Sequence, residues 1–449
     1  MRLAVHTDPG ARSDPGSGLQ DASQAQWHDG RGSSIPLNTH LADRDADELP
    51  RAEAALHLLL ARSRLTDDEQ VRARNLADAV PDWSRFARIS AHSFGSPFVL
   101  RHQAVLQLAR RDGRAHAQMH AQARRFALDS LRFAAAQRSF HDACIGPVGA
   151  GHVYLKGPCL AAAYHGDIGL RPCRDIDVLV SEEAFEPVLR TAMDAGYAPI
   201  LDQRTGTTIR DARDLRALLR YKPKETPLRS PDGVIVELHR SVDDRPDLFD
   251  TNETIAASVE TRICSTVYRV LPAPLLLVYL CQHHTRHLWS KLHWVADLDA
   301  VLRHPDCDLA EARAIAERKG LGPVLEACLG FHRLTGNPDL WHSISPDDRA
   351  AQLLEACIDN LGGDLDRERE IQRETRSRFR WAGPESSWTR TLGSYGPRRL
   401  RPALQHYVDW PLPDHLQWLY SFVRIKDAVG LRLARAAASF TGQRRDHWK

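Results

Sequence analysis

The sequence predicts an α+β protein in which a small mixed β-sheet, organised as an α/β core, lies between two helical regions. Between about 149 and 272, short apolar runs with strand character alternate with helical segments, which is typical of a sheet covered by helices. Before and after this stretch, apolar residues recur at helical spacing. The turn signal Pro231-Asp232-Gly233 separates two of the predicted strands and indicates a hairpin.

The 449-residue chain divides into four segments. Residues 1–46 are rich in Gly, Ser, Asp, Pro and His without an apolar period, which predicts a disordered tail. We expect residues 47–148 to form an N-terminal helical region, 149–272 a sheet-containing core, and 273–449 a C-terminal helical domain.

The elements of the core follow one another in a definite order. We expect strands at 152–155, 175–180, 197–201, 218–222 and 234–240, and helices at 160–164 and 182–195. Gly196 is placed to end the second of these helices. Further along, Ser345 and Pro346 indicate a helix start, and a basic amphipathic helix is expected around 431–435.

Composition narrows the class of protein. The formal charge of +2 gives no overall electrostatic signature for nucleic acid or for an acidic membrane. The eight cysteines are scattered without a Cys-x-x-Cys pair, which disfavours structural zinc and a disulfide framework. The N-terminus lacks a signal pattern, and no apolar stretch is long enough to span a bilayer, so we expect a cytoplasmic protein.

Three carboxylates in the core are candidate ligands for divalent metal ions. Asp175 and Asp177 lie two apart in a predicted strand, so both side chains point to one face while Ile176 and Val178 enter the core on the other. Glu237 lies in the later apolar strand. Adjacent acids repel, and such a pair persists most readily when a divalent cation binds between them. Two such ions, about 3.5–4 Å apart, stabilise phosphoryl and nucleotidyl transfer. Mg²⁺, or Mn²⁺, is therefore the expected cofactor.

Basic groups flank these acids. Lys156 and Gly157 end the first predicted strand where a helix begins; the glycine lets backbone N–H groups approach a phosphate, and the lysine could neutralise it. Arg171 and Arg174 precede the acidic strand. An Asp-x-Asp pair or a Lys-Gly turn alone is more often plain surface or turn, but the ordered set of motifs fits one geometry.

These motifs resemble those of the polymerase-β-like nucleotidyltransferase superfamily and, more closely, those of a bacterial family of uncharacterised nucleotidyltransferases, NTP_transf_5. The resemblance spans roughly 50–335 and is carried by Leu155-Lys156-Gly157, Arg171-Pro172, Asp175-Ile176-Asp177-Val178-Leu179-Val180 and Glu237-Leu238-His239. A helical signature follows at His283, His287, Trp289, Leu292, Trp294 and Asp297. It implies a sheet-based nucleotidyltransferase fold in which Asp175, Asp177 and Glu237 hold the metal ions. The wider superfamily places Gly-Ser at Lys156-Gly157, and this departure leaves the donor nucleotide open.

Histidines complete the candidate site. His239 lies on the face of Glu237 and could bind a phosphate, orient the carboxylate, or serve as a structural partner. His283 and His287 share a helical face. Zinc there is disfavoured because the general-base Glu of a zincin is missing, and the resemblance implies that this helix shapes the acceptor pocket. We interpret Trp289 and Trp294 as core residues and Asp297 as a helix cap or a partner of an arginine.

The predicted activity is metal-dependent transfer of a nucleotidyl group from a nucleoside triphosphate to a hydroxyl or phosphate. The acceptor, whether a small molecule, a peptide or a macromolecule, stays open. Alternatives are a transferase using another activated donor, such as a sugar nucleotide, in peptide or natural-product tailoring; a toxin-like modifier of RNA or protein; and a non-catalytic binding protein. Retention of all three acids argues against the last.

Overall fold

The computed structural model describes residues 51–203, 205–222, 224–243, 248–345, 347–361 and 402–426. The expected N-terminal tail and the expected helix around 431–435 lie outside these residues. Eight strands form one mixed sheet in the order β4-β3-β5-β6-β2-β1-β8-β7, with helical regions before and after it, which confirms the α+β prediction. Among the described residues, none of the helices combines the length and the apolar character needed to cross a membrane.

The strands are short and come mostly from the middle of the chain. They are β1 (His152–Tyr154), β2 (Ile176–Val180), β3 (Ala198–Asp202), β4 (Thr207–Thr208), β5 (Glu225–Arg229), β6 (Ile235–His239), β7 (Val259–Ile263) and β8 (Thr266–Val270). In the centre, β2 pairs antiparallel with β1 and parallel with β6. The predicted strands at 152–155, 175–180 and 197–201 are thus confirmed to within one residue.

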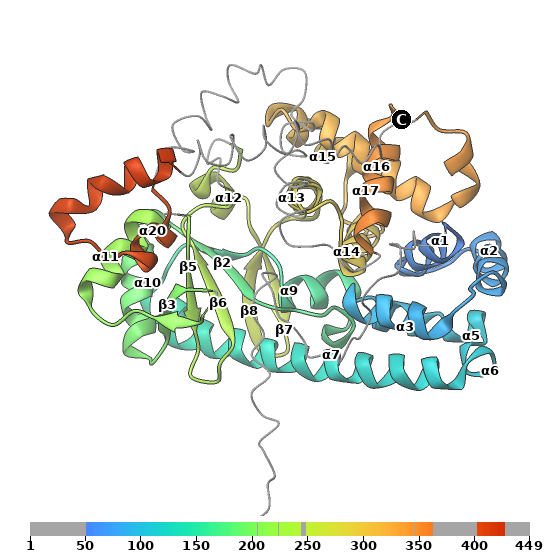
Figure 1. Ribbon diagram of the computed structural model, residues 1–449, viewed down its shortest axis with the longest axis horizontal. Helices are drawn as coiled ribbons and strands as arrows, with labels where there is room; N and C mark the ends of the chain where they lie inside the picture. Colours follow the sequence, from blue (N-terminus) through green and yellow to red (C-terminus); the bar gives the residue numbers. More distant parts are fainter. Residues whose placement is uncertain are drawn as a thin grey trace, which may run out of the picture.

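Helices cover both faces of the sheet (Figure 1). The long helix α7 (Gly113–Phe140) and α10 (Glu182–Asp194) lie on one face, where Phe140 and Phe185 join an apolar core with Ile176 and Val178. Helices α12 (Thr251–Ala256) and α13 (Ala273–Arg286) lie over the other face, whose core includes Leu179. Because strand side chains alternate, Asp177 shares the α13 face with Leu179.

Short segments join these layers. After β1 the chain continues through α9 (Pro158–Leu160), one π-helical turn η2 (Ala161–His165) and the 3₁₀ turn η3 (Ile168–Leu170) before it enters β2. The predicted helix at 160–164 corresponds to α9 and η2, and that at 182–195 is confirmed as α10. A π-helical turn η1 (His141–Ile145) and α8 (Gly146–Val148) lead from α7 into β1.

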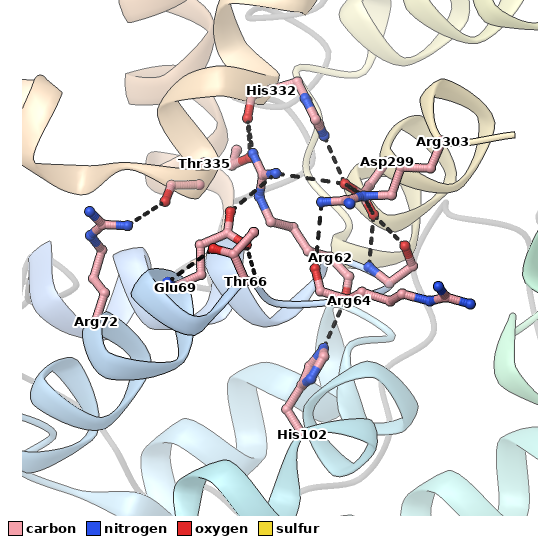
Figure 2. A network of polar contacts seen from close by, with 12 residues as sticks. Arg62, Arg64, Thr66, Glu69, Arg72, His102, Asp299, Arg303, His332 and Thr335 are labelled. Carbon is pink, nitrogen blue, oxygen red and sulfur yellow. Dashed lines mark hydrogen bonds and ion pairs between the residues drawn. The ribbon is translucent and has the colours of Figure 1, made fainter. Parts of the chain in front are cut away.

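The N-terminal helical region and the C-terminal helices pack against each other beside the sheet (Figure 1). The N-terminal helices are α1 (Arg51–Leu60), α2 (Asp67–Asp78), α3 (Trp83–His92), α4 (Ser96–Arg101), α5 (Gln103–Leu106) and α6 (Leu108–Arg111). The C-terminal ones are α13, α14 (Leu292–Leu302), α15 (Leu309–Arg318), α16 (Gly322–Gly336), η4 (Pro338–His342) and α17 (Arg349–Leu361). Asp299 of α14 joins the two groups through the polar network of Figure 2.

One predicted strand is wrong. Residues 218–222 belong to the end of helix α11 (Ala212–Tyr221) and the residue after it, and the strand that pairs with β6 is β5, at Glu225–Arg229. The Asp211 carboxylate accepts hydrogen bonds from the backbone N–H groups of Arg213 and Asp214, which starts a helix there. Leu218 then packs on α20 (Leu404–Asp409), an element too distant in sequence for local periodicity to reveal.

The helix predicted after Ser345 exists but begins later. Helix α17 starts at Arg349, and the Asp348 carboxylate accepts a hydrogen bond from the backbone N–H of Ala350. The Ser345 hydroxyl instead accepts one from the N–H of Asp347, ahead of the helix. Asp348 therefore supplies the cap that the sequence assigned to Ser345.

Candidate active site

Strand register places two of the predicted acids side by side. Asp177 of β2 lies directly opposite Glu237 of β6 in a parallel pairing, so both carboxylates project from the same face of the sheet toward α13. The Asp177 side chain is almost fully buried, whereas that of Glu237 retains 16% of its exposure. Asp175 lies just before β2 and is partly exposed. The pair therefore combines a buried carboxylate, Asp177, with one that solvent can still reach, Glu237.

His239 connects three carboxylates from neighbouring strands. Its Nε2 lies 3.1 Å from Asp177 Oδ1 and 3.5 Å from Glu237 Oε2. On its other side, Nδ1 lies 3.7 Å from Oε2 of Glu225, which is opposite His239 in the β5–β6 ladder. The ring is buried, so it holds the orientation of Asp177 and lies between acids on both sides.

Lys156 approaches the same aspartate from the end of β1. Its Nζ lies 3.2 Å from Asp177 Oδ2 and 3.4 Å from His283 Nε2 on α13. The following Gly157 has φ 74° and ψ −145°, a conformation that disfavours any residue with a Cβ. This turn therefore needs its glycine, and it delivers the lysine to the carboxylates.

The electrostatics of the acids differ sharply. Burial and the neighbouring Asp177 charge raise the pKa of Asp175 to about 7. Burial alone would also raise the pKa of Asp177, but Lys156 and His239 hold it well below its usual range. Burial opposes the charged form of His239, yet its hydrogen bonds to Asp177 and Glu237 raise its pKa to about 9. Negative charge is thus concentrated on Asp177, and further negative charge beside it is disfavoured.

A cation-binding set emerges from these positions. Ligand atoms of Asp177, Glu237 and His239 all lie within 4.8 Å of one another. Asp177 Oδ2 is buried and receives no hydrogen bond of good geometry from any described residue, although the Lys156 ammonium lies near it. Oxygen ligands with unsatisfied lone pairs suit a hard divalent cation. Asp175 is not among these three residues, and the third of them, His239, contacts Asp177 Oδ1 through its Nε2.

Two predicted phosphate-binding residues have other contacts. Arg171 is buried, and its Nε and one terminal nitrogen donate to both oxygens of Asp297 at 2.8–3.0 Å. This confirms the interpretation of Asp297 as the partner of an arginine. Arg174, which precedes β2, is exposed, and its guanidinium lies 4.3 Å from the centre of the Phe94 ring.

Helix α13 contacts the site through His283. Besides contacting Lys156, the His283 ring lies 5.0 Å from that of His287, at the end of the helix. Burial and Lys156 hold the pKa of His283 well below its usual range, so it is a neutral imidazole. His284, which the sequence did not single out, is fully buried and stacks on Trp294. Trp289 is a core residue, as predicted.

Sequence reasoning missed the third strand of the site. Glu225 begins β5, and the ammonium groups of Lys222 and Lys224 lie 3.3 and 3.0 Å from its oxygens. Burial alone would raise the pKa of Glu225, but Lys224 and His239 hold it well below its usual range. The signal that could have found it is the hairpin turn, because counting seven residues in each direction from Asp232, at the centre of the turn, pairs Glu225 with His239.

Comparison with known families agrees with this geometry. No curated protein matches the chain. The family model described as an uncharacterised nucleotidyltransferase, NTP_transf_5, matches residues 80–336. This range covers more than half of the chain and includes the acids, Lys156 and the α13 histidines. The chain therefore belongs to the NTP_transf_5 family of uncharacterised nucleotidyltransferases and is a transferase enzyme.

Proposed function

We propose that this protein moves a nucleotidyl group from a nucleoside triphosphate to a hydroxyl or phosphate of an acceptor. The observation that carries the proposal is the parallel register that sets Asp177 beside Glu237, with Asp175 two residues earlier. Three acids gathered on two adjacent central strands are costly unless positive charge joins them. The family to which the chain belongs supports the same reaction class.

The residues fit a divalent cation. Asp177 Oδ2 is buried without a good hydrogen bond among the described residues, and burial together with the Asp177 charge raises the pKa of Asp175 to about 7. A cation held by Asp177 and Glu237 would satisfy the first, and its positive charge beside Asp175 would offset the second, which would allow Asp175 to ionise and join them. Carboxylate oxygens suit Mg²⁺ or Mn²⁺. When bound, such ions neutralise the charge of the transferring phosphoryl group and of the attacking and leaving oxygens.

The surrounding side chains have distinct proposed roles. His239 positions Asp177 by donating to its Oδ1. Lys156 balances the Asp177 charge and would turn toward the donor phosphates when a cation takes over that task. Glu237, the more exposed acid of the pair, would accept the proton of the acceptor hydroxyl.

The proposed substrate-contacting set keeps most of the sequence prediction. It comprises Lys156, Gly157, Arg174, His239, His283 and His287. We assign Arg171 a supporting role instead, because its guanidinium is engaged by Asp297 of α14.

The test is transfer of label from each nucleoside triphosphate with Mg²⁺ or Mn²⁺, to water or to an acceptor in a cell extract. Asp177→Asn and Glu237→Gln keep side-chain shape and remove charge. Each is expected to lower the rate by about 10²–10³-fold, as does loss of one preorganised electrostatic group in other enzymes.

The matched control is Asp232→Asn. Asp232 lies in the exposed turn of the same β5–β6 hairpin. Its substitution by Asn therefore removes the same charge as the site variants from the same pair of strands. Its rate should equal that of the unmodified protein. Equal nucleotide and metal binding in the unmodified protein and in both site variants would contradict the proposal.

A further inference from the structure

Three polar atoms converge on the surface of the N-terminal helical region, away from the carboxylates. His116 Nε2 and His120 Nε2 lie 3.1 Å apart. The side-chain oxygen of Gln103 lies 3.0 Å from the first and 3.1 Å from the second. The three atoms therefore form a nearly equilateral triangle of two imidazole nitrogens and one amide oxygen.

Two helices supply this triangle. His116 and His120 are one turn apart on the first part of α7, so they share a helical face, and their rings lie 4.4 Å apart. Gln103 is the first residue of the short helix α5. In Figure 1, α5 and this end of α7 lie at the opposite end of the molecule from strands β3 and β5. His120 is exposed and His116 is half-buried, so the triangle faces solvent.

The spacing matches the face of a metal coordination shell. Ligand atoms at about 2.0–2.1 Å from a metal ion lie about 2.9 Å apart at a right angle and about 3.4 Å apart at a tetrahedral angle. The observed edges of 3.0–3.1 Å fall between these values.

Hydrogen bonding alone satisfies this arrangement poorly. If both imidazoles donated to the Gln103 oxygen, both Nε2 atoms would carry hydrogen, and two N–H groups would then face each other across 3.1 Å. A cation at the centre instead accepts a lone pair from all three atoms.

We propose that Gln103, His116 and His120 form a binding site for a divalent late transition-metal ion, with Zn²⁺, Ni²⁺ and Cu²⁺ as the ions that imidazole ligands favour. The site would fasten α5 to α7. Between α5 and α7 the helical geometry is interrupted at Gln107, whose φ of 49° is unusual for a residue with a Cβ. A metal bridge across this break would stabilise the connection between α4 and α7.

The experiment measures Zn²⁺ and Ni²⁺ stoichiometry by equilibrium dialysis on the full chain, for the unmodified protein, His116→Ala and His120→Ala. Each variant should lose one equivalent or weaken it by at least about tenfold, since even loss of an outer-shell partner costs 10–100-fold. Zn²⁺ can also bind at the acidic site, so the tested quantity is the difference between proteins. His415→Ala, at an exposed histidine elsewhere, is the matched control and should lose nothing.

A gain-of-affinity variant tests the third ligand. Gln103→Glu replaces the amide oxygen by a carboxylate of the same reach and should tighten Zn²⁺ binding and increase the metal-dependent rise of the thermal midpoint. Equal stoichiometry and equal midpoint shifts in the unmodified protein, His116→Ala and His120→Ala would overturn the site. Unchanged affinity in Gln103→Glu would remove Gln103 from it. Midpoints measured without metal report whether each variant folds.

Discussion

Two buried aspartates, Asp177 and Asp299, are equally hidden from solvent but are bonded in opposite ways. Asp299 accepts hydrogen bonds from the backbone N–H and the hydroxyl of Ser63, from Arg303 and from His332, at 2.7–3.1 Å (Figure 2). Arg62 lies 3.8 Å away. Asp177 has an oxygen without a good hydrogen bond among the described residues, and two further acids beside it.

This difference in hydrogen bonding distinguishes a structural carboxylate, Asp299, from a carboxylate that can still bind a ligand, Asp177. Asp299 of α14 holds the α1–α2 connection and α16 in place, and its partners are cations and donors only. Around Asp177, positive and negative groups are balanced so that another cation still has an oxygen to bind. Buried charge that is fully paired stabilises a junction, whereas incomplete pairing next to like charge marks a functional site.

The largest expected loss of stability comes from Asp299→Asn. The substitution leaves the buried Arg62 near a neutral group, and breaking a buried ion pair costs about 3–5 kcal/mol. Denaturant unfolding should show this loss. Transferase activity per folded molecule should stay close to that of the unmodified protein, and a large drop in it would show that the junction takes part in catalysis.

Lys156→Met tests the other side of the comparison. Removing the ammonium leaves the buried Asp177 carboxylate with His239 as its remaining cationic contact, at a cost of about 1–3 kcal/mol. Added Mn²⁺ should restore more stability to this variant than to the unmodified protein, because the cation would occupy the vacated contact. A thermal midpoint that rises equally with Mn²⁺ in both proteins contradicts a cation at Asp177.

Asp175→Asn is expected to stabilise the protein. The folded-state pKa of Asp175 is about 7, above its ordinary value of 3.8, so ionisation is less favourable in the folded state. Its destabilising contribution is absent below about pH 4, grows as the pH rises toward 7 and is constant above that. The variant should therefore be more stable than the unmodified protein at pH 8 and equally stable at pH 4. Unfolding curves at both pH values, without divalent metal, measure the difference.

The smallest effect is expected at the rim of the Asp299 network. Thr66 and Glu69 form a reciprocal capping box at the start of α2, and Glu69 also lies 3.4 Å from Arg62. Thr66→Ala should cost about 1 kcal/mol, the usual value of a lost cap. Thr66→Ser, which keeps the hydroxyl, is the control and should restore most of it. A loss as large as that of Asp299→Asn would show that the cap orders the whole junction.

The sequence predicted the two central strands because their apolar alternation and acid positions are local features. Local patterns alone do not show that β2 and β6 are adjacent and parallel, since that contact joins residues 60 positions apart; the family resemblance is what placed Glu237 with the two aspartates. Because the strand was predicted at 218–222 instead of Glu225–Arg229, Glu225 was not recognised as a neighbour of His239. Arg171 resembled a phosphate ligand until its partner Asp297, 126 positions later, was visible. Residue types indicated the chemistry, and long-range pairing decided which of the candidate residues lie together.

The β2–β6 register also guards against misassembly. Val236 and Leu238 enter the core under α10, while Glu237 and His239 face α13. A slip of β6 by one residue would exchange the two sets, burying a carboxylate and an imidazole in that core and exposing two aliphatic side chains. The same register fills the core and aligns Asp177 with Glu237. A chain that folds stably therefore also has the acid alignment that the proposed function requires. Selection for folding and selection for activity therefore act on the same strand contact.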